Sequence, residues 1–255
     1  MYLRDCQHDG PQVGGMTLRG RFWDWRLCCC SGSGLTVQAR PFAIIIDLAT
    51  GLSCQIAVLM SGMSTTLPQD ALVRNIEKHV SSLWPKARLS ICKWPRGPVE
   101  ELGSEFAVLE ISPTRDSNNL WVYCTAGTGG VEGEVQQHEF LMLSSLADER
   151  HVETLTMVSH YHRFESALSL GHIVTIGGSW AEGSSCSRLL MSLPYPFGPK
   201  LEWLRTPGLL VRFLWALPIT PEEADFAKLN SVEELERQFD AVQLRYWDPQ
   251  RQSVV

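Results

Sequence analysis

The chain has 255 residues, of which 44% are hydrophobic and 20% are charged. This composition is typical of a globular protein with one sizeable core and excludes a disordered chain. The formal net charge of −6 and the pI near 5.7 provide no basic surface for nucleic acid, which we exclude as a partner.

Residues 1–62 show no sustained helical or strand pattern and are predicted to form an irregular N-terminal extension. Within them, the apolar segment 41–60 is long enough to be compared with a signal or membrane helix. Asp47 near its middle, Gly51 and the 40 preceding residues argue against both, so we expect no membrane partner. An alternative is that the natural protein starts at Met63, which the intact mass of the natively expressed protein would decide.

The eight cysteines are unevenly distributed, and five of them lie in the first 54 residues. No Cys-x-x-Cys pair and no Cys/His spacing of a zinc module is present. The later Cys92, Cys124 and Cys186 have apolar neighbours, as small core residues do. We therefore expect a protein of the reducing cytoplasm, with no metal and no cofactor.

From residue 67 the pattern becomes regular. Leu72, Ile76 and Val80 predict an amphipathic helix that begins near Pro68 and ends before Pro85. Short apolar segments separated by turn-rich sequence then predict consecutive strands, which favours an antiparallel sheet. The expected strands are 88–94, 106–112, 120–125 and 139–143.

The glycine cluster at 127–130 invites comparison with a phosphate-binding loop, because main-chain N–H groups at such turns can bind anions. The Lys-Ser/Thr pair and the helix start that such a loop requires are missing, and Glu132 and Glu134 follow directly. A simple turn is the preferred interpretation.

The stretch 151–197 is predicted to be the stretch around which the fold is organised. Met157, Tyr161, Phe164 and Leu168 follow the i, i+4, i+7, i+11 spacing of one helical face. A helix buried on more than one side is therefore expected over 151–168. Gly171 is the expected helix stop, and the β-branched segment 172–176 predicts a strand.

Two apolar strands are expected at 189–193 and 209–217, the second ended by Pro218 and Pro221. Thr220 and Pro221 mark a helix start as N-cap and first helical residue. Ser231 marks the start of a further helix over 231–239.

The histidines and a serine of this region are candidates for metal binding or for catalysis. Four of the seven histidines lie at 151, 160, 162 and 172. On a helix, the side chains of His160 and His162 would point about 200° apart, which is a poor geometry for binding one metal ion. For His172 we favour a structural hydrogen bond across the fold over a functional role. Ser179 approximates a nucleophile elbow, but the final glycine is missing and no histidine follows residue 172, so hydrolase activity is not expected.

Several separate motifs, in matching order and spacing, resemble the suppressor-of-fused domain in its bacterial form. They cover roughly residues 70–255. The motifs are LGHIV at 170–174, SRLLMSLP at 187–194, FLWALPITPEEADF at 213–226, SVEELERQF at 231–239 and YWDPQRQSVV at 246–255.

The resemblance implies a single domain over residues 63–255 with a mixed, mainly antiparallel sheet flanked by helices (α/β, α+β type) and no catalytic centre. It also implies protein binding: animal relatives restrain transcription factors of the Hedgehog pathway by clasping an extended peptide, and bacterial relatives act as immunity proteins against toxins. The chain has one such domain, so the second half of the animal protein and its partner are not carried over. The contact residues of the peptide clasp match no motif here.

We therefore expect a cytoplasmic, non-enzymatic protein that sequesters or neutralises another protein, a toxin being one option. Rigid rings in turns between strands can fill a partner's pockets. The expected partner-binding residues are Trp180, Tyr195, Phe197 and Trp203, together with Pro196. Alternatives are a small-molecule sensor with a pocket beneath the turn at 170–172, and a scaffold domain tethered by residues 1–62.

Overall fold

The computed structural model describes residues 69–97, 99–129, 136–206 and 209–255, and the expectations for residues 1–62 lie outside this range. Almost every element expected in the described part is present, with small shifts of its ends. In chain order the elements are α1 (Gln69–Leu83), β1 (Leu89–Cys92), α2 (Val99–Leu102), β2 (Ala107–Ile111), η1 (Arg115–Ser117), β3 (Trp121–Ala126), β4 (Gln136–Ser144), α3 (Glu149–His160), η2 (Tyr161–Glu165), β5 (Ile173–Thr175), β6 (Arg188–Ser192), α4 (Pro199–Glu202), β7 (Trp203–Thr206), β8 (Leu209–Ile219), α5 (Pro221–Leu229) and α6 (Val232–Ala241).

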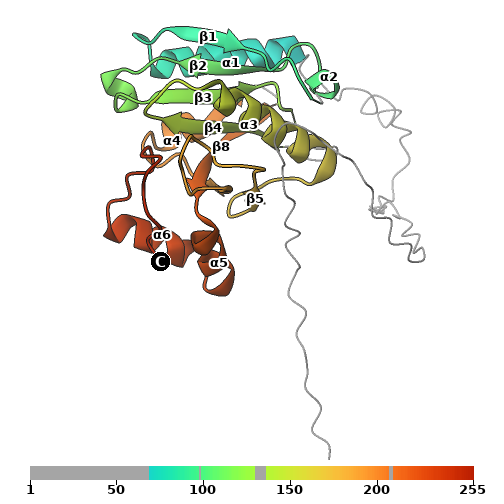
Figure 1. Ribbon diagram of the computed structural model, residues 1–255. Helices are drawn as coiled ribbons and strands as arrows, with labels where there is room; N and C mark the ends of the chain where they lie inside the picture. Colours follow the sequence, from blue (N-terminus) through green and yellow to red (C-terminus); the bar gives the residue numbers. More distant parts are fainter. Residues whose placement is uncertain (1–68, 98, 130–135, 207–208) are drawn as a thin grey trace, which may run out of the picture. The chain divides into compact units, whose positions relative to one another are not determined.

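The described strands form one eight-stranded sheet in the order β1-β2-β3-β4-β8-β6-β5, with β7 also paired to β8 (Figure 1). All neighbouring pairs are antiparallel except β4 and β8, which are parallel. The expected mixed, mainly antiparallel sheet is confirmed. Strand β8 is long because β7 and then β6 pair one after the other along it.

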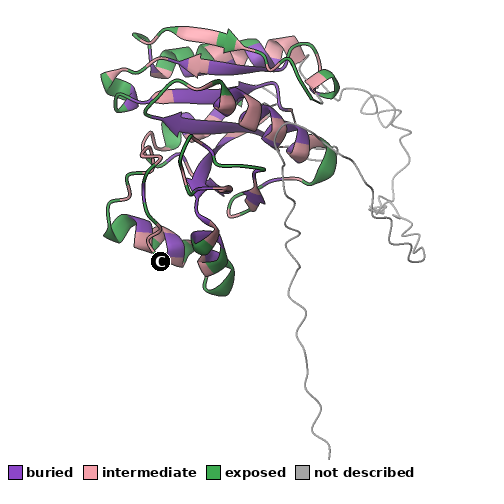
Figure 2. Ribbon diagram, viewed as in Figure 1, coloured by how far each residue is buried: buried purple, intermediate pink, exposed green. Residues whose placement is uncertain are grey.

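The central strands are buried on both faces, as Figure 2 shows. Successive side chains of a strand point to opposite faces, and in β4 Leu141 packs in the same cluster as Ile76 of α1, whereas Phe140 packs with Leu155 of α3. Helices α5 and α6 join the α1 side through residues such as Leu235. Helices therefore cover both faces of the sheet, in agreement with the expected α/β class.

Helix α3 ends earlier than its apolar spacing predicts. Its start is capped by Asp148, whose side chain accepts the N–H of Arg150 at 3.0 Å. After His160 the chain widens into one π-helical turn, η2, and leaves the helix at Ser166, whose backbone is extended. The N–H of Leu168 donates to Nδ1 of His162 at 2.9 Å. The predicted helix over 151–168 was thus too long at its C-terminal end. Gly171, with φ of +84°, belongs to the turn before β5 and does not cap α3.

Pro218 does not end the preceding strand, contrary to the expectation from sequence. Strand β8 continues to Ile219, with Pro218 opposite Leu189 of β6. Pairing of β8 with β4 stops at Trp215, so on that side of β8 no strand requires a backbone N–H from residue 218. A proline, which has no N–H, is therefore tolerated there. The expected cap of α5 is confirmed: the Thr220 side chain accepts the N–H of Glu223, and Pro221 is the first helical residue.

A buried ion pair ties the C-terminal segment to the junction of β8 and α5. The Arg251 guanidinium donates to both carboxylate oxygens of Glu223, each at 2.7 Å, and to the carbonyl oxygen of Pro218 at 2.9 Å. Glu223 is 0% exposed and also accepts the N–H groups of Thr220 and Val254. This pair fixes the end of the chain against the base of α5.

No helix of the described part is long and apolar enough to cross a membrane.

Candidate protein-binding site

A surface hollow lies beside α6, and we call it the α6 groove. It has a volume of about 580 Å³, within the range of ligand-binding clefts. Three elements distant in sequence form it: the turn that follows β6, the second half of β8, and α6 with the segment that follows it. The lining residues are Ser192, Tyr195, Pro196, Trp215, Leu217, Glu233, Glu236, Arg237, Phe239, Asp240, Gln243, Leu244 and Tyr246.

A hydrogen-bonded carboxylate joins the two sides of the α6 groove. Glu236 accepts the hydroxyl of Ser192 at 2.6 Å through one oxygen and the phenol of Tyr195 at 2.9 Å through the other. Burial and the neighbouring carboxylate raise the pKa of Tyr195 to about 12, so the phenol keeps its proton and remains a donor. Tyr195 is nevertheless 56% exposed. Its ring is therefore held in place while much of it faces solvent.

The floor of the groove is apolar and contains one buried donor without an acceptor. Trp215 is 3% exposed, and its indole Nε1 has no hydrogen-bond partner in the part of the chain that the structure describes. Tyr246 packs edge-on against this indole, with ring centroids 4.7 Å apart. Buried polar groups normally have a partner, so Trp215 marks the floor as a place where an entering acceptor is favoured. Leu217, Phe239 and Leu244 complete the apolar part of the lining.

The end of α6, which forms one wall of the groove, carries a backbone conformation that favours glycine. The N–H of Leu244 donates to the carbonyl of Phe239 and that of Gln243 to the carbonyl of Asp240, the two bonds of a Schellman motif. Its left-handed residue is Gln243, with φ of +51°.

We expect Gln243→Gly to stabilise the protein by about 0.5–1 kcal/mol, since glycine adopts this conformation without the Cβ clash. Urea unfolding measures the change. The matched control is Gln238→Gly inside α6, which should destabilise by about 1 kcal/mol. Destabilisation of equal size at both positions would contradict the argument.

Of the rings predicted to contact a partner, the structure brings Tyr195 to the α6 groove, with its neighbour Pro196. Trp180 is 1% exposed and stacks on His151, with centroids 5.4 Å apart. It is a core residue, and we leave it out of the candidate site. The apolar Cys186 and Leu189 are in the same core cluster, which explains why the ring is buried although its chain neighbours are exposed.

The other two predicted rings lie outside the groove lining and are partly buried. Phe197 packs edge-to-face on Trp84, the residue that follows α1, with centroids 5.1 Å apart. Trp203 lies on β7 beneath the guanidinium of Arg212, at 5.0 Å from the ring centroid, and Arg212 in turn pairs with Glu202. Both rings thus contact other parts of the fold, and neither is among the residues that line the α6 groove.

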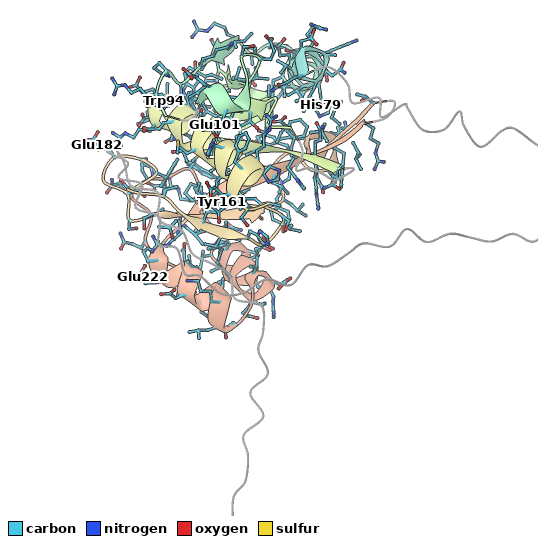
Figure 3. All side chains as sticks on the ribbon, turned by 90° about the vertical axis from the view of Figure 1, so that its right-hand side faces the viewer. His79, Trp94, Glu101, Tyr161, Glu182 and Glu222 are labelled. Carbon is cyan, nitrogen blue, oxygen red and sulfur yellow. The ribbon has the colours of Figure 1, made fainter. Side chains whose placement is uncertain are left out.

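The histidines singled out in sequence lie in separate environments. His151 is enclosed by Tyr123 and Trp180, and burial lowers its pKa to about 4. His160, the last residue of α3, contacts the carboxylate of Glu101 of α2 at 2.9 Å. Glu101 is labelled in Figure 3. Within the described residues no group of His, Cys, Asp and Glu side chains is arranged to hold a metal ion.

His172 forms its hydrogen bonds locally and not across the fold, contrary to the expectation. Its ring contacts the hydroxyl of Ser169 at 3.2 Å and accepts the N–H of the same residue at 3.3 Å. The main chain alone reaches the neighbouring strand: the carbonyl of His172 accepts the N–H of Met191 at 2.8 Å. The side chain is exposed and stabilises the turn before β5.

The glycine-rich turn after β3 does bind an anion, but that anion is an internal one. The N–H groups of Gly127 and Thr128 donate to the carboxylate of Glu139, at 2.9 and 3.1 Å, and the hydroxyl of Thr125 donates to its other oxygen. Glu139 is fully buried, and this burial raises its pKa to about 7 despite the donors. The turn therefore holds β4 in place, and its N–H groups are already occupied by the side chain of Glu139 from β4.

A smaller hollow of about 240 Å³ lies at the turn where a sensor pocket was expected, next to Gly171 and Ile173 of the β5 region and Lys228 of α5. It is below the usual size of small-molecule sites. Ser179 is exposed, and within the described part its side chain makes no hydrogen bond to a histidine. Neither feature competes with the α6 groove as a candidate site.

Sequence reasoning missed most of the groove. Glu233, Glu236 and Asp240 follow one another at spacings of three and four residues, which places them on one face of α6. That acidic stripe was a readable signal. The partners of Glu236, which lie 41 and 44 residues earlier, could not be found in this way because only the tertiary fold brings them to α6.

Comparison with known proteins agrees with this fold. The chain matches the family model of Suppressor of fused protein (SUFU) over residues 103–252. A SUFU homologue from Neisseria gonorrhoeae FA 1090 is 33% identical, with a TM-score of 0.63, over 72% of this chain and 97% of that one. No curated protein sequence matches the chain.

Two further structures share the fold at 13% identity and a TM-score of 0.54, each over 72% of this chain. One is the Sufu–Fu complex, where 92% of the other chain is covered. The second is Drosophila Suppressor of Fused, of which this chain spans about half, 51%. With a family match over more than half its length and a homologue 33% identical to it, the chain belongs to the suppressor-of-fused family.

Proposed function

We propose that this chain is a non-catalytic protein that binds and sequesters another protein through the α6 groove. The observation that carries the proposal is the groove itself: about 580 Å³ with an apolar floor, bordered by the exposed ring of Tyr195, which Glu236 holds in place. Ordered aromatic rings beside apolar hollows are the features that dominate protein interfaces. Little conformational entropy is lost when such a ring meets a partner.

Family membership supports the same function. The Sufu–Fu complex is an assembly of a family relative with another protein, and a homologue is found in the bacterium Neisseria gonorrhoeae. We propose the cytoplasm as the place of action and neutralisation of a toxin as the role. In this proposal Phe197 and Trp203 support the fold around the groove and do not contact the partner.

The experiment that tests the proposal is affinity purification of the full chain from its native cells, followed by mass spectrometry. We expect wild type to retain one stoichiometric protein, and Tyr195→Ala to bind it at least about tenfold more weakly. The matched control is Leu229→Ala on α5, another exposed apolar side chain outside the groove.

The outcomes separate function from site. Failure of wild type to retain any protein, from cells that express its genomic neighbours, would refute the binding function. Equal retention by Tyr195→Ala and Leu229→Ala would refute the groove as the contact. A retained partner that is a toxin, and whose toxicity the full chain suppresses in cells, would support the neutralising role.

A further inference from the structure

The charges around the α6 groove are unbalanced. Glu233, Glu236 and Asp240 line it, and none of the three forms an ion pair within the described residues. Among the described lining residues Arg237 is the one cation, and its guanidinium pairs with Glu234. With three carboxylates and one arginine that is itself paired, the groove lining has a net negative charge.

Glu236 is the centre of this charge. It is half-buried, and the two hydroxyls that donate to it, those of Ser192 and Tyr195, are both neutral. A carboxylate has about four lone-pair positions, so two hydroxyl donors leave acceptor capacity for a cation. A charge-assisted bond to Lys or Arg is stronger than a neutral one, and partial burial reduces screening by salt.

A second observation points to the main chain of an occupant. Trp215 lines the groove, and its buried Nε1 donor has no acceptor among the described residues. A carbonyl oxygen of an entering segment can supply it, whereas an isolated metal or ammonium ion cannot. An apolar floor, an unpaired buried donor and an acidic rim together fit a peptide segment with mixed character.

We propose that the α6 groove recognises a basic and apolar segment of the partner protein. A Lys or Arg binds the carboxylates of Glu236 and Asp240, and an adjacent large apolar side chain lies against the floor at Leu217. This inference rests on the proposed function and adds the chemistry of the partner to it. It predicts that acidic segments are rejected, because their charge would face an unneutralised carboxylate.

The test is selection of a random 12-residue phage-displayed peptide library on the immobilised full chain. We expect the enriched peptides to share a Lys or Arg next to a large apolar residue. A synthetic copy of the most enriched peptide is then titrated by fluorescence anisotropy. Glu236→Gln and Asp240→Asn should each weaken it at least about fivefold, and added salt should weaken binding to wild type.

The matched control is Glu222→Gln, which removes the same charge from α5 outside the groove (Figure 3) and should change affinity by less than about twofold. Circular dichroism of each variant shows whether it is folded. The inference is wrong if no peptide is enriched, if the enriched peptides lack a cation, or if Glu236→Gln binds like Glu222→Gln. A native partner that is lost by Tyr195→Ala but kept by Glu236→Gln would leave the proposed function standing and refute the cationic segment alone.

Discussion

Arg251→Met is expected to lower the free energy of unfolding by about 3–5 kcal/mol, because it leaves a buried carboxylate without its cation. Glu223 is 0% exposed and receives both 2.7 Å bonds of the guanidinium, while Arg251 also satisfies the carbonyl of Pro218. Urea unfolding at neutral pH measures the loss. The same substitution at Arg237, whose pair with Glu234 is largely exposed, should cost less than about 1 kcal/mol.

A double variant separates the stranded charge from lost packing. Glu223→Gln in the Arg251→Met background removes the charge and keeps an acceptor oxygen for one of the two N–H groups of Thr220 and Val254, which donate to different oxygens of Glu223. We expect the double variant to be more stable than Arg251→Met alone. If it is less stable, lost packing and hydrogen bonds of the arginine, and not the uncompensated carboxylate, account for the cost.

The dependence of stability on pH is expected to be set by three buried groups that act in opposite directions. Burial lowers the pKa of His151 and of His162 from 6.5 to about 4. Below pH 6.5 the unfolded chain binds protons that these folded histidines do not, so stability falls as the pH falls from 6.5 to about 4, by about 3 kcal/mol for each.

Glu139 opposes this loss. Its pKa is raised from 4.5 to about 7, so between these values the folded protein binds a proton that the unfolded chain does not. Stability from this group therefore rises by about 3 kcal/mol as the pH falls through the same range. The sum for the three groups is a net loss of about 3 kcal/mol on acidification from neutral pH to about pH 4.

The variant Glu139→Gln should remove the opposing contribution and about double the loss on acidification, to about 6 kcal/mol. Each protein is compared with itself at neutral and acid pH, so any constant change from the substitution cancels. The control is Glu110→Gln, a partly exposed glutamate on β2, which should follow the wild-type profile. Parallel profiles for wild type and Glu139→Gln would show that Glu139 does not gain a proton on folding.

Local sequence determined most of the elements of this protein. Thr220, Pro221 and Glu223 specify the start of α5 because a cap, a proline and an acidic first turn act within three residues of one another. The apolar spacing of α1 and the short β-branched segments are likewise local patterns. Each predicts the type of its element and which face of that element is buried. Mixed strand directions and the helices on both faces followed from these elements and from the family resemblance.

Tertiary contacts decided what local patterns could not. Pro218 stays in β8 because β4 no longer pairs there. Trp180 is buried because it packs in one core cluster with Cys186 and Leu189 and because His151 stacks on it. Each outcome depends on a neighbour whose position the local spacing does not encode.

The candidate site shows the same division. The sequence by itself determined the acidic stripe on α6 and the exposed turn that carries Tyr195, because helix period and turn composition are local properties. Only the tertiary structure decided that Glu236 meets the hydroxyls of Ser192 and Tyr195 and that Trp215 lies in the lining of the same groove. The physical reason is that a binding site requires convergence of side chains from distant segments, and convergence is fixed by the packing of helices against the sheet.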